Sequence, residues 1–456
     1  MDINDTIAAI ATPAGKGGIG IVRVSGAKAH ETAAAVFRAK SGEDIKKIKG
    51  YTARLGNVVS REGTIIDEAV ALVYREPKSY TGEDAVEIMC HGGEIVCENV
   101  LAELIAAGAV MAGPGEFTRR ALVNGRLTLT EAEAVCDLIN AASRQGGNAA
   151  AALQSGALYR KTVSLKERIL EIQVHITAYI DFPEEDVDEI DLKSLQEKIE
   201  TLKQQLEKLL ASYDVGASVL RGVPAVIAGS PNVGKSTLLN LLSGSQKAIV
   251  TPIAGTTRDV VEQQIRLGGT TLILADTAGI RESADEIEKL GIERAVSRVD
   301  EASLVLAVFD ASRSLDEDDR RVIVHVKGKR VVAVVNKTDL EQKLDTEELE
   351  KVFGDIIYIS ANDESAIAEL DAAVARAVEI DKLDPDEPLL ANERQRGCAR
   401  RAQSAVAEAA AASRGTTLDV VYALLGEALE ALAELSGENM TETVLDEVFS
   451  RFCVGK

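Results

Sequence analysis

The amino-acid sequence predicts a multi-domain α/β protein in which an α/β domain is inserted into a helical one. Three observations lead to this prediction. The chain opens with β-rich runs, and two regions of helical periodicity flank residues 215–380. Within 215–380, apolar strands alternate with helical runs, a pattern typical of a doubly wound domain. Because the two ends of such a domain can lie close together, we expect the flanking helices to form one discontinuous all-α domain.

Residues 1–118 are expected to form an α+β domain of their own. Short β-rich runs at residues 19–24, 69–74 and 85–89 are separated by turn signals. The segment 15–20 fits the dinucleotide-binding pattern G-x-G-x-x-G, but that motif opens a helix, and here a β-like run follows. We therefore reject a dinucleotide-binding fold for this region.

The helical domain is predicted at residues 119–214 and 381–456. Its first part contains Thr130 and Glu133, which have the spacing of a capping box. Apolar residues that recur at three- and four-residue steps predict one buried helix face. These residues are Leu195, Ile199, Leu202, Leu206 and Leu209.

Composition narrows the classes of function. The 456-residue chain carries a formal net charge of −22, and most non-specific affinity for nucleic acid comes from Lys and Arg that neutralise phosphates. An RNA partner would therefore need a local basic patch or a second, basic subunit. The acidic stretch 183–191 is interpreted as a solvated loop that could also repel stray RNA, and residues 383–388 as a linker.

The cysteines and the apolar runs predict a soluble, cytoplasmic protein. The 5 cysteines include no Cys-x-x-Cys pair, which is typical of reduced thiols and gives no sign of a structural metal site. The N-terminus lacks the features of a signal peptide, and no run approaches the roughly eighteen apolar residues of a membrane span.

Residues 229–236, Gly-Ser-Pro-Asn-Val-Gly-Lys-Ser, form a phosphate-loop motif. The motif follows the apolar run 223–228 and opens the helical run 237–242, which is the strand-to-helix context that it requires. Its glycines allow backbone N–H groups to face phosphates. Lys235 is placed to reach the β- and γ-phosphates of a nucleotide, and the Ser236 hydroxyl is a ligand for Mg²⁺.

Four further blocks complete a guanine-nucleotide site in order. Residues 255–259 come first, and Asp276–Gly279 then ends an apolar strand, where it would sense the γ-phosphate. Asn336–Asp339 ends another strand, and Asp339 can accept two hydrogen bonds that guanine donates and adenine does not, which favours GTP over ATP by about 10⁴ to 10⁵. Ser360–Ala361 would add a backbone N–H for guanine O6. The residues predicted to bind GTP are Asn232, Val233, Gly234, Lys235, Ser236, Thr237, Thr251, Thr256, Thr257, Asp276, Thr277, Ala278, Gly279, Asn336, Lys337, Asp339, Ser360 and Ala361.

Motifs outside the nucleotide site indicate a family. They are Ile-Ala-Ala-Ile-Ala-Thr-Pro at 7–13, Ser-Tyr-Thr-Gly-Glu-Asp at 79–84, His-Gly-Gly at 91–93, Pro-Gly-Glu-Phe at 114–117 and Phe-Cys-Val-Gly-Lys at 452–456. With these motifs and the nucleotide site, the chain resembles the MnmE (TrmE) family of tRNA-modification GTPases over essentially its whole length. The resemblance implies a Ras-like α/β G domain at 215–380 and an N-terminal domain that binds tetrahydrofolate and dimerises.

The resemblance also implies an activity and partners. The family builds a carboxymethylaminomethyl or aminomethyl group on C5 of the wobble uridine (position 34) of certain tRNAs. It acts as a homodimer together with MnmG (GidA), a partner that uses FAD and NADH, in a heterotetramer. A tetrahydrofolate, in the 5,10-methylene or 5-formyl form, carries the one-carbon unit.

The motifs assign residues to the folate and to the chemistry at uridine. By their match to the family, Arg23, Glu83, Arg126 and Lys456 would bind the folate. Arg126 stands where relatives often carry Lys, which keeps the charge but changes the donor geometry. Cys453, beside a cation, is a candidate catalytic thiol or a small residue that packs the last helix.

Hydrolysis of GTP requires a group other than the one that Ras uses. Ile280 stands where Ras-like enzymes carry the glutamine that orients the attacking water. An apolar side chain cannot position water, so another group must act. The resemblance implies Glu288 as that group, with Glu286 as the less favoured choice.

The resemblance further implies that K⁺ replaces an arginine finger and that two G domains pair across their switch faces. Thr257 would join Ser236 on Mg²⁺. The K⁺ ligands would be Asn232 of the phosphate loop together with Thr251, Ile253 and Thr256.

Two other classes of protein share the nucleotide motifs. The first is a GTP-switched ribosome-assembly or RNA-binding factor, such as Era or Der, that does no chemistry on a substrate. It is disfavoured because the C-terminal region is helical and acidic, and because it gives the motif residues at 23, 83 and 452–456 no role. The second, the G domain of a transporter of the FeoB kind, is excluded by the lack of a spanning segment. Binding of tetrahydrofolate separates the first class from the MnmE family.

Overall fold

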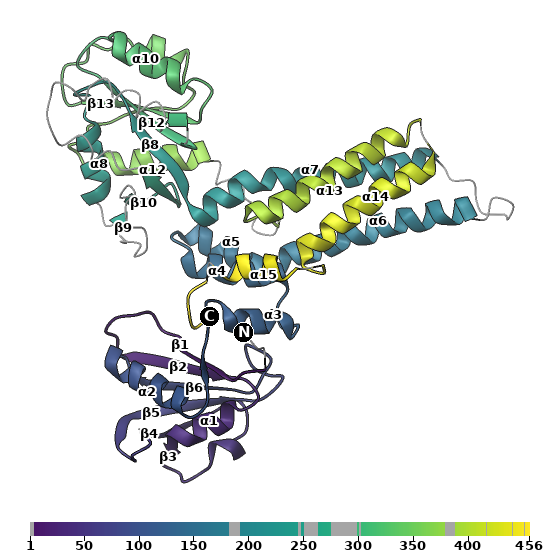
Figure 1. The fold of residues 1–456 in the computed structure, drawn as a ribbon. Coiled ribbons are helices and arrows are strands. Elements are labelled where there is room, and N and C mark those ends of the chain that lie inside the picture. The colour runs from purple at the N-terminus through teal and green to yellow at the C-terminus, as the bar shows by residue number, and fades with distance from the viewer. Residues whose placement is uncertain are drawn as a thin grey trace. The chain divides into compact units, whose positions relative to one another are not determined.

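The computed structural model describes residues 4–181, 192–244, 248–249, 263–274, 299–300, 302–378, 388–415, 417–439, 441–450 and 452–456. The chain divides into two compact units (Figure 1). The first unit joins Met1–Cys136 to Ala433–Lys456, and the second is Asp137–Leu432. This division into two units does not test the domain boundaries expected from the sequence, which stay predictions.

A seven-stranded sheet organises the first unit. Its strand order is β3-β4-β5-β6-β2-β1-β7, and every neighbouring pair is antiparallel except β1 with β7. The strands are β1 (Ile7–Ile10), β2 (Ile19–Ser25), β3 (Phe37–Ala39), β4 (Thr52–Val59), β5 (Ile65–Tyr74), β6 (Ala85–His91) and β7 (Val110–Met111).

Two helices complete the core of this sheet. The helices α1 (Ala29–Val36) and α2 (Glu94–Ala106) place their apolar positions in one cluster with alternate residues of the strands. The three predicted β-rich runs are confirmed as parts of β2, β5 and β6. The rejection of a dinucleotide-binding fold is also confirmed, because β2 begins at Ile19, inside the glycine pattern.

The helices α3 (Glu116–Val123), α4 (Leu129–Asn140) and α15 (Glu442–Phe449) also lie wholly or partly in the first unit. The predicted capping box at Thr130 and Glu133 is wrong. The reciprocal bonds are made by the Thr128 backbone N–H to Glu131 Oε2, at 2.7 Å, and by the Glu131 N–H to Thr128 Oγ1, at 3.3 Å. The sequence Thr-Leu-Thr-Glu-Ala-Glu offers the same spacing twice, and the helix begins at the first pair, which leaves the second pair buried within it.

The second unit contains a second seven-stranded sheet, of order β14-β13-β12-β8-β11-β10-β9. The pairs from β14 to β11 are parallel, and those that β10 forms with β11 and β9 are antiparallel. The strands are β8 (Val223–Ala228), β9 (Ala248–Ile249), β10 (Gln263–Leu267), β11 (Thr270–Leu274), β12 (Leu304–Asp310), β13 (Val331–Asn336) and β14 (Ile356–Tyr358).

Both faces of this sheet are covered. Alternate residues of the fully buried β12 enter two separate apolar clusters, Leu304 and Leu306 in one, Val305 and Ala307 in the other. A parallel sheet that is buried on both faces has continuous apolar runs as its strands, and this explains the unbroken apolar runs in the sequence. The covering helices are α8 (Lys235–Gly244), α10 (Glu317–Val326), α11 (Glu347–Glu350) and α12 (Ala366–Val378).

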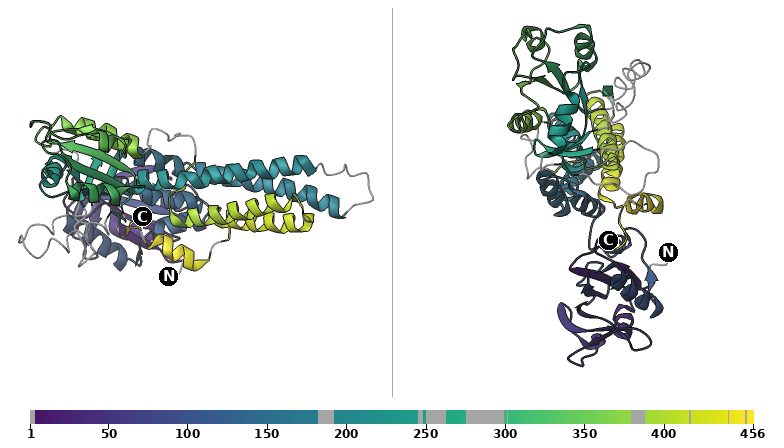
Figure 2. Two further views of the ribbon diagram at one scale, coloured as in Figure 1. Left: turned by 90° about the horizontal axis from the view of Figure 1, so that it is seen from above. Right: turned by 90° about the vertical axis from the view of Figure 1, so that its left-hand side faces the viewer.

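Long helices make up the rest of the second unit. Figure 2 shows α7 and α13 running lengthwise beside each other. The predicted apolar face of residues 195–209 is confirmed, since all five of its residues are buried on α7. No helix in the described ranges combines the length and the apolar character that a membrane crossing needs. The long helices are α5 (Arg144–Gln154), α6 (Ala157–Asp181), α7 (Leu192–Arg221), α13 (Glu393–Ala412) and α14 (Leu418–Ser436).

Candidate functional sites

The phosphate-loop motif connects β8 to α8 at the carboxyl edge of the second sheet. Helix α8 begins at Lys235, so the unpaired N–H groups of its first turn face the loop. Gly229 lies against β12, where an added Cβ would come within 2.5 Å of the Val308 carbonyl oxygen. Asn232 and Gly234 have positive φ angles of 63° and 100°, a conformation that Asn and Gly tolerate better than other residues.

Asn336 joins three of the predicted blocks. Its Nδ2 donates to the Val233 carbonyl at 2.9 Å, and its Oδ1 accepts from the Ala361 N–H at 2.9 Å. A Cβ at Gly234 would overlap the Asn336 amide, so this close approach requires glycine. The structure therefore brings the phosphate loop, the Asn336–Asp339 block and the Ser360–Ala361 block together through one buried side chain.

Replacement Asn336→Ala is expected to loosen the phosphate loop. It leaves a buried carbonyl and a buried N–H without partners, each worth about 1 to 3 kcal/mol. We expect the free energy of local opening at residues 229–236, measured by hydrogen exchange, to fall by about 2 to 6 kcal/mol. Asn240→Ala, at an exposed position of α8, is the matched control. Unchanged protection of the loop in the first variant would contradict the bridging role.

Lys235 makes two contacts within the loop. Its Nζ donates to the carbonyl oxygens of Gly229 and Ser230, at 2.8 and 2.7 Å. Burial lowers the pKa of Lys235 from its ordinary value, and the negative charge of Asp319 opposes this shift. The side chains of Asn232, Ser236 and Thr237 lie at the surface of the loop, partly or fully exposed.

The Asn336–Asp339 block, predicted to read the base, contains one side chain held by an ion pair, Lys337, and one exposed side chain, Asp339. Lys337, at φ 66°, donates through Nζ to Asp310 Oδ2 at 2.6 Å. Burial raises the pKa of Asp310, but hydrogen bonds from Lys337 and Ser312 outweigh burial and hold that pKa below its ordinary value. Asp339 is exposed, and its carboxylate can therefore accept hydrogen bonds from a ligand.

Several residues predicted to bind the nucleotide or the metals, or to act on water, lie outside the described residues. Their roles stay predictions from the sequence. They are Thr251, Ile253, Thr256, Thr257, Asp276, Thr277, Ala278, Gly279, Glu286 and Glu288.

Sequence reasoning missed a group of side chains beneath the phosphate loop. Ser230, Arg313 and Asp319 bond to one another there. Asp310, which pins Lys337, was missed as well, although it ends an apolar strand, and that position could have marked it. Arg313 lies in the connection between β12 and α10, and Asp319 lies in the first turn of α10. Neither residue belongs to a nucleotide-binding motif.

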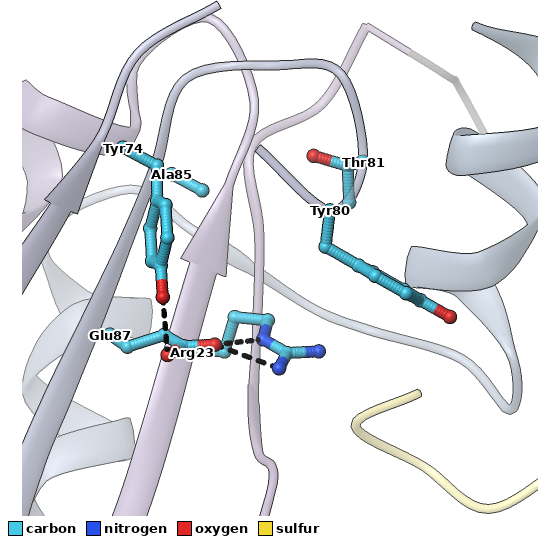
Figure 3. A pocket seen from close by; sticks show the side chains of 6 residues that line it. All are labelled: Arg23, Tyr74, Tyr80, Thr81, Ala85 and Glu87. Atoms are coloured by element: carbon cyan, nitrogen blue, oxygen red, sulfur yellow. Dashed lines mark hydrogen bonds and ion pairs between the residues drawn. The ribbon is translucent and has the colours of Figure 1, made fainter. Parts of the chain in front are cut away.

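A second candidate site lies in the first unit. It is a cavity of about 180 Å³ lined by Arg23, Tyr74, Tyr80, Thr81, Ala85 and Glu87 (Figure 3). Arg23 donates through Nε to Glu87 Oε1 at 2.8 Å, and the Tyr74 hydroxyl donates to Glu87 Oε2 at 3.2 Å. Burial, together with the negative charge of Glu87, raises the pKa of Tyr74 to about 12. The Arg23 guanidinium also lies 5.5 Å from the centre of the Tyr80 ring.

Glu83 is held by a residue that the sequence analysis missed. Arg120 is 1% exposed and donates to Glu83 Oε1 at 3.2 Å and to Glu116 Oε1 at 3.0 Å. Ser25, two residues after Arg23 on β2, donates to Glu83 Oε2 at 2.8 Å. The four-residue spacing of Glu116 and Arg120 on a helix was the available signal.

The segment 452–456 lies against this part of the first unit. Val454 pairs with Pro114, and the Gly455 carbonyl accepts from Arg23 at 3.4 Å. Gly455 has φ 96°, and a Cβ there would overlap the Ile10 carbonyl oxygen, so the approach requires glycine. Burial, and then the positive charge of Arg23, lower the pKa of Lys456, with Glu87 opposing.

The structure thus places Lys456 near Arg23 and Glu87 of the cavity. Glu83 is bonded to Ser25 of β2, the strand that also carries Arg23. Arg126 is exposed, and its Cγ lies 3.2 Å from where a Cβ of Gly82 would be. Cys453 is exposed, and its carbonyl oxygen accepts from the Gly115 N–H at 3.3 Å.

Comparison with known proteins finds two family matches. Residues 6–126 match the family described as the N-terminus of the GTP-binding protein TrmE, and residues 129–453 match the family described as the MnmE helical domain. Curated relatives match from end to end. The tRNA modification GTPase MnmE of Acetivibrio thermocellus is 41% identical, with 99% of each chain covered, and that of Symbiobacterium thermophilum is 42% identical, with 99% of each covered. That of Alkaliphilus oremlandii is 39% identical over 100% of each chain.

Several solved structures match a part of the chain. The G domain of the T. maritima FeoB iron transporter is 25% identical, covers 34% of this chain and 98% of its own, and has a TM-score of 0.26. A likeness of that extent decides nothing about function.

Proposed function

Because this chain belongs to the MnmE family of tRNA modification GTPases, we propose that it hydrolyses GTP to GDP and phosphate in the course of tRNA modification. The observation that carries the nucleotide part is the placement of Asn336. Its side chain bonds to the phosphate loop and to the Ser360–Ala361 block. The three blocks predicted to bind the phosphates and the guanine base therefore lie at the same edge of the sheet. Release of phosphate from GTP, but not from ATP, by the purified chain is the direct test.

The finer proposal concerns the reaction on tRNA. The chain adds a carboxymethylaminomethyl or aminomethyl group to C5 of the wobble uridine of certain tRNAs, together with the FAD-dependent partner MnmG. A tetrahydrofolate supplies the one-carbon unit when it is bound. Loss of the aminomethyl-type wobble nucleosides from cells that lack the chain, resolved by mass, is the test of this substrate class.

The cavity of the first unit supports the folate part of the proposal. The pyrimidine ring of a tetrahydropterin carries amino and ring N–H groups, and the carboxylate of Glu87 in the cavity, with that of Glu83 held by Ser25, is the kind of acceptor that such groups need. Tyr74 and Tyr80 offer aromatic surface to the ring. Arg23, Arg126 and Lys456 offer positive charge to the glutamate tail.

Two metal ions are proposed at the nucleotide site. Ser236 and Thr257 would hold Mg²⁺, and Asn232, Thr251, Ile253 and Thr256 would hold K⁺. Oxygen donors suit both of these hard cations, and Asn232 and Ser236 carry such oxygens at the surface of the loop. The cations supply positive charge beside the phosphates when bound, and Glu288 is proposed to act on the attacking water.

The charge of the chain supports a partner in tRNA binding. With a formal net charge of −22, the chain lacks the overall basic charge that gives non-specific affinity for phosphates. We propose that it works as a homodimer within a heterotetramer with MnmG, and that MnmG supplies basic surface to the tRNA. Tight, salt-sensitive binding of tRNA by this chain alone would contradict that division.

Replacement Lys456→Ala is expected to weaken tetrahydrofolate binding by at least about tenfold, because it removes a partly buried cation at the cavity. Calorimetry with 5-formyltetrahydrofolate measures the change, and the turnover of GTP should stay as it was. Lys49→Ala, an exposed lysine of the same unit, is the control. An unchanged affinity would remove Lys456 from the site. If the parent chain also ignored folates, with and without its flavoprotein partner, a GTP-switched ribosome-assembly factor would become the better description.

A further inference from the structure

Three side chains bond to one another beneath the phosphate loop, and Arg313 extends the network to Asp316, whose Oδ2 lies 2.8 Å from Arg313 Nη1. Ser230 Oγ lies 2.6 Å from Asp319 Oδ1, and Arg313 reaches both, with Nη2 at 2.7 Å from Ser230 Oγ and Nη1 at 2.7 Å from Asp319 Oδ2. Arginine can only donate, so the Ser230 hydroxyl accepts from Arg313 and must donate its own proton to the carboxylate. The polarity of every bond in the ring is therefore determined.

The network is buried where it meets the loop. Ser230 is 3% exposed and the Asp319 side chain 1%, whereas Arg313 is 32% exposed and reaches in from the surface. Asp319 also receives the Asp316 N–H within the capping box that begins α10. A buried carboxylate that is paired and fully hydrogen-bonded is fixed in place, and so is the hydroxyl that it holds.

Ser230 attaches the network directly to the phosphate loop. Ser230 is the second residue of the motif, and its carbonyl, with that of Gly229, receives Lys235 Nζ. The far end of the loop is tied separately, by Asn336 on the Val233 carbonyl. The stretch between these two ties contains Asn232 in its left-handed conformation.

We propose that Asp319, oriented and neutralised by Arg313, is a positioning residue that sets the conformation of the phosphate loop through Ser230. The proposal rests on the proposed GTPase function and names a part of the machinery of the same site. Asp319 acts on the loop, and Arg313 keeps the carboxylate from repelling the nucleotide phosphates. The proposal therefore concerns the phosphate end of the nucleotide and leaves recognition of the base to Asp339.

The proposal predicts an ordered set of affinities. Ser230→Ala removes both hydrogen bonds of the Ser230 hydroxyl, and Asp319→Asn replaces the charged acceptor with an amide. We expect each to weaken GDP binding about tenfold to hundredfold. Arg313→Ala leaves the carboxylate buried and without its cation near the phosphates, and should weaken GDP more than either. Adding Asp319→Asn to Arg313→Ala removes that charge and should restore part of the loss, which is a coupling that a double-mutant cycle measures.

The experiment is competition against a fluorescent GDP on the full chain, with GDP, GTP and GMP as competitors. GMP lacks the β-phosphate, so we expect its affinity to stay close to that of the parent chain in all variants. Asp318→Asn and Arg321→Ala, exposed neighbours on α10, are the matched controls. Ser230→Ala tests the same bond from the side of the loop if the Asp319 variant fails to fold.

Three outcomes overturn the proposal. Equal losses for GMP and GDP would mean that the network only maintains the fold, and GDP affinities equal to that of the parent chain would remove it from the site. Additive effects of the Arg313 and Asp319 changes would refute the neutralising role. A parent chain that binds no guanine nucleotide would instead refute the proposed function itself, and this inference with it.

Discussion

Exchange of potassium for sodium is expected to slow GTP hydrolysis by this chain by a factor of about 10³ to 10⁵, the range over which an arginine finger acts in other GTPases. Ile280 cannot orient water, so the proposed mechanism needs another positive group beside the phosphates. Asn232 exposes its amide on the phosphate loop, which is where a cation between loop and nucleotide would find a ligand. Phosphate release is measured in KCl and in NaCl at matched ionic strength and constant Mg²⁺.

Replacement Asn232→Lys tests whether K⁺ bound at this residue causes the difference in GTP hydrolysis between the two salts. The variant should hydrolyse GTP slowly in both salts, so that the two rates become equal. Lysine is also disfavoured at the positive φ of this position, and GDP affinity measured in NaCl reports such strain independently of K⁺. Asn240→Ala should keep the full potassium dependence. Equal turnover of the parent chain in the two salts would eliminate the potassium mechanism.

Replacement Asp339→Asn is expected to reduce affinity for GTP by about 10⁴ and to raise affinity for xanthosine triphosphate. In the predicted contact the carboxylate would accept from guanine N1–H and N2–H₂, whereas an amide would oppose one of them with its own donor. Xanthine carries an oxygen in place of the exocyclic amine, and that oxygen suits the amide. Competition of the two nucleotides against a fluorescent GDP gives both affinities.

The control for this exchange is Asp318→Asn, which lies on the surface of the same sheet domain. Asp339 is exposed, so the substitution should leave the fold intact, and the unfolding temperature checks that expectation. Loss of GTP affinity without a gain for the xanthine nucleotide would indicate damage to the loop. Unchanged preference for GTP would exclude Asp339 as the reader of the base.

The parts of the nucleotide site that sequence predicts well are those at strand ends. Apolar runs mark β8 and β13, and the residues that follow each run must lie at one edge of a parallel sheet. Periodicity alone therefore places Lys235 and Asn336 on the same edge. It does not show that Asn336 also bonds to the loop, because that contact depends on how closely the loop approaches the end of β13.

Contacts between distant segments were beyond the reach of pattern reasoning. Ser230 and Asp319 are 89 residues apart, and Arg23 and Gly455 are 432 apart. Neither pair has a spacing that signals contact. The family resemblance linked Lys456 with Arg23, but no feature of composition or periodicity did so. The capping box shows a different limit, since two pairs with identical spacing compete and only the start of the helix decides between them.

The docking of segment 452–456 on the first unit has a consequence for biosynthesis. Strand β1 leaves the ribosome early, but Gly455, which packs closely against the Ile10 carbonyl of β1, follows only after the other unit has been made. At about 5 to 20 residues per second, that delay amounts to about 20 to 90 s. For the later part of it, Ala132 and Val135 lack the cover that Phe449 and Phe452 then provide. The nascent chain thus exposes the apolar side chains of Ala132 and Val135, and the bond from Arg23 to the Gly455 carbonyl forms only after translation has passed the whole second unit.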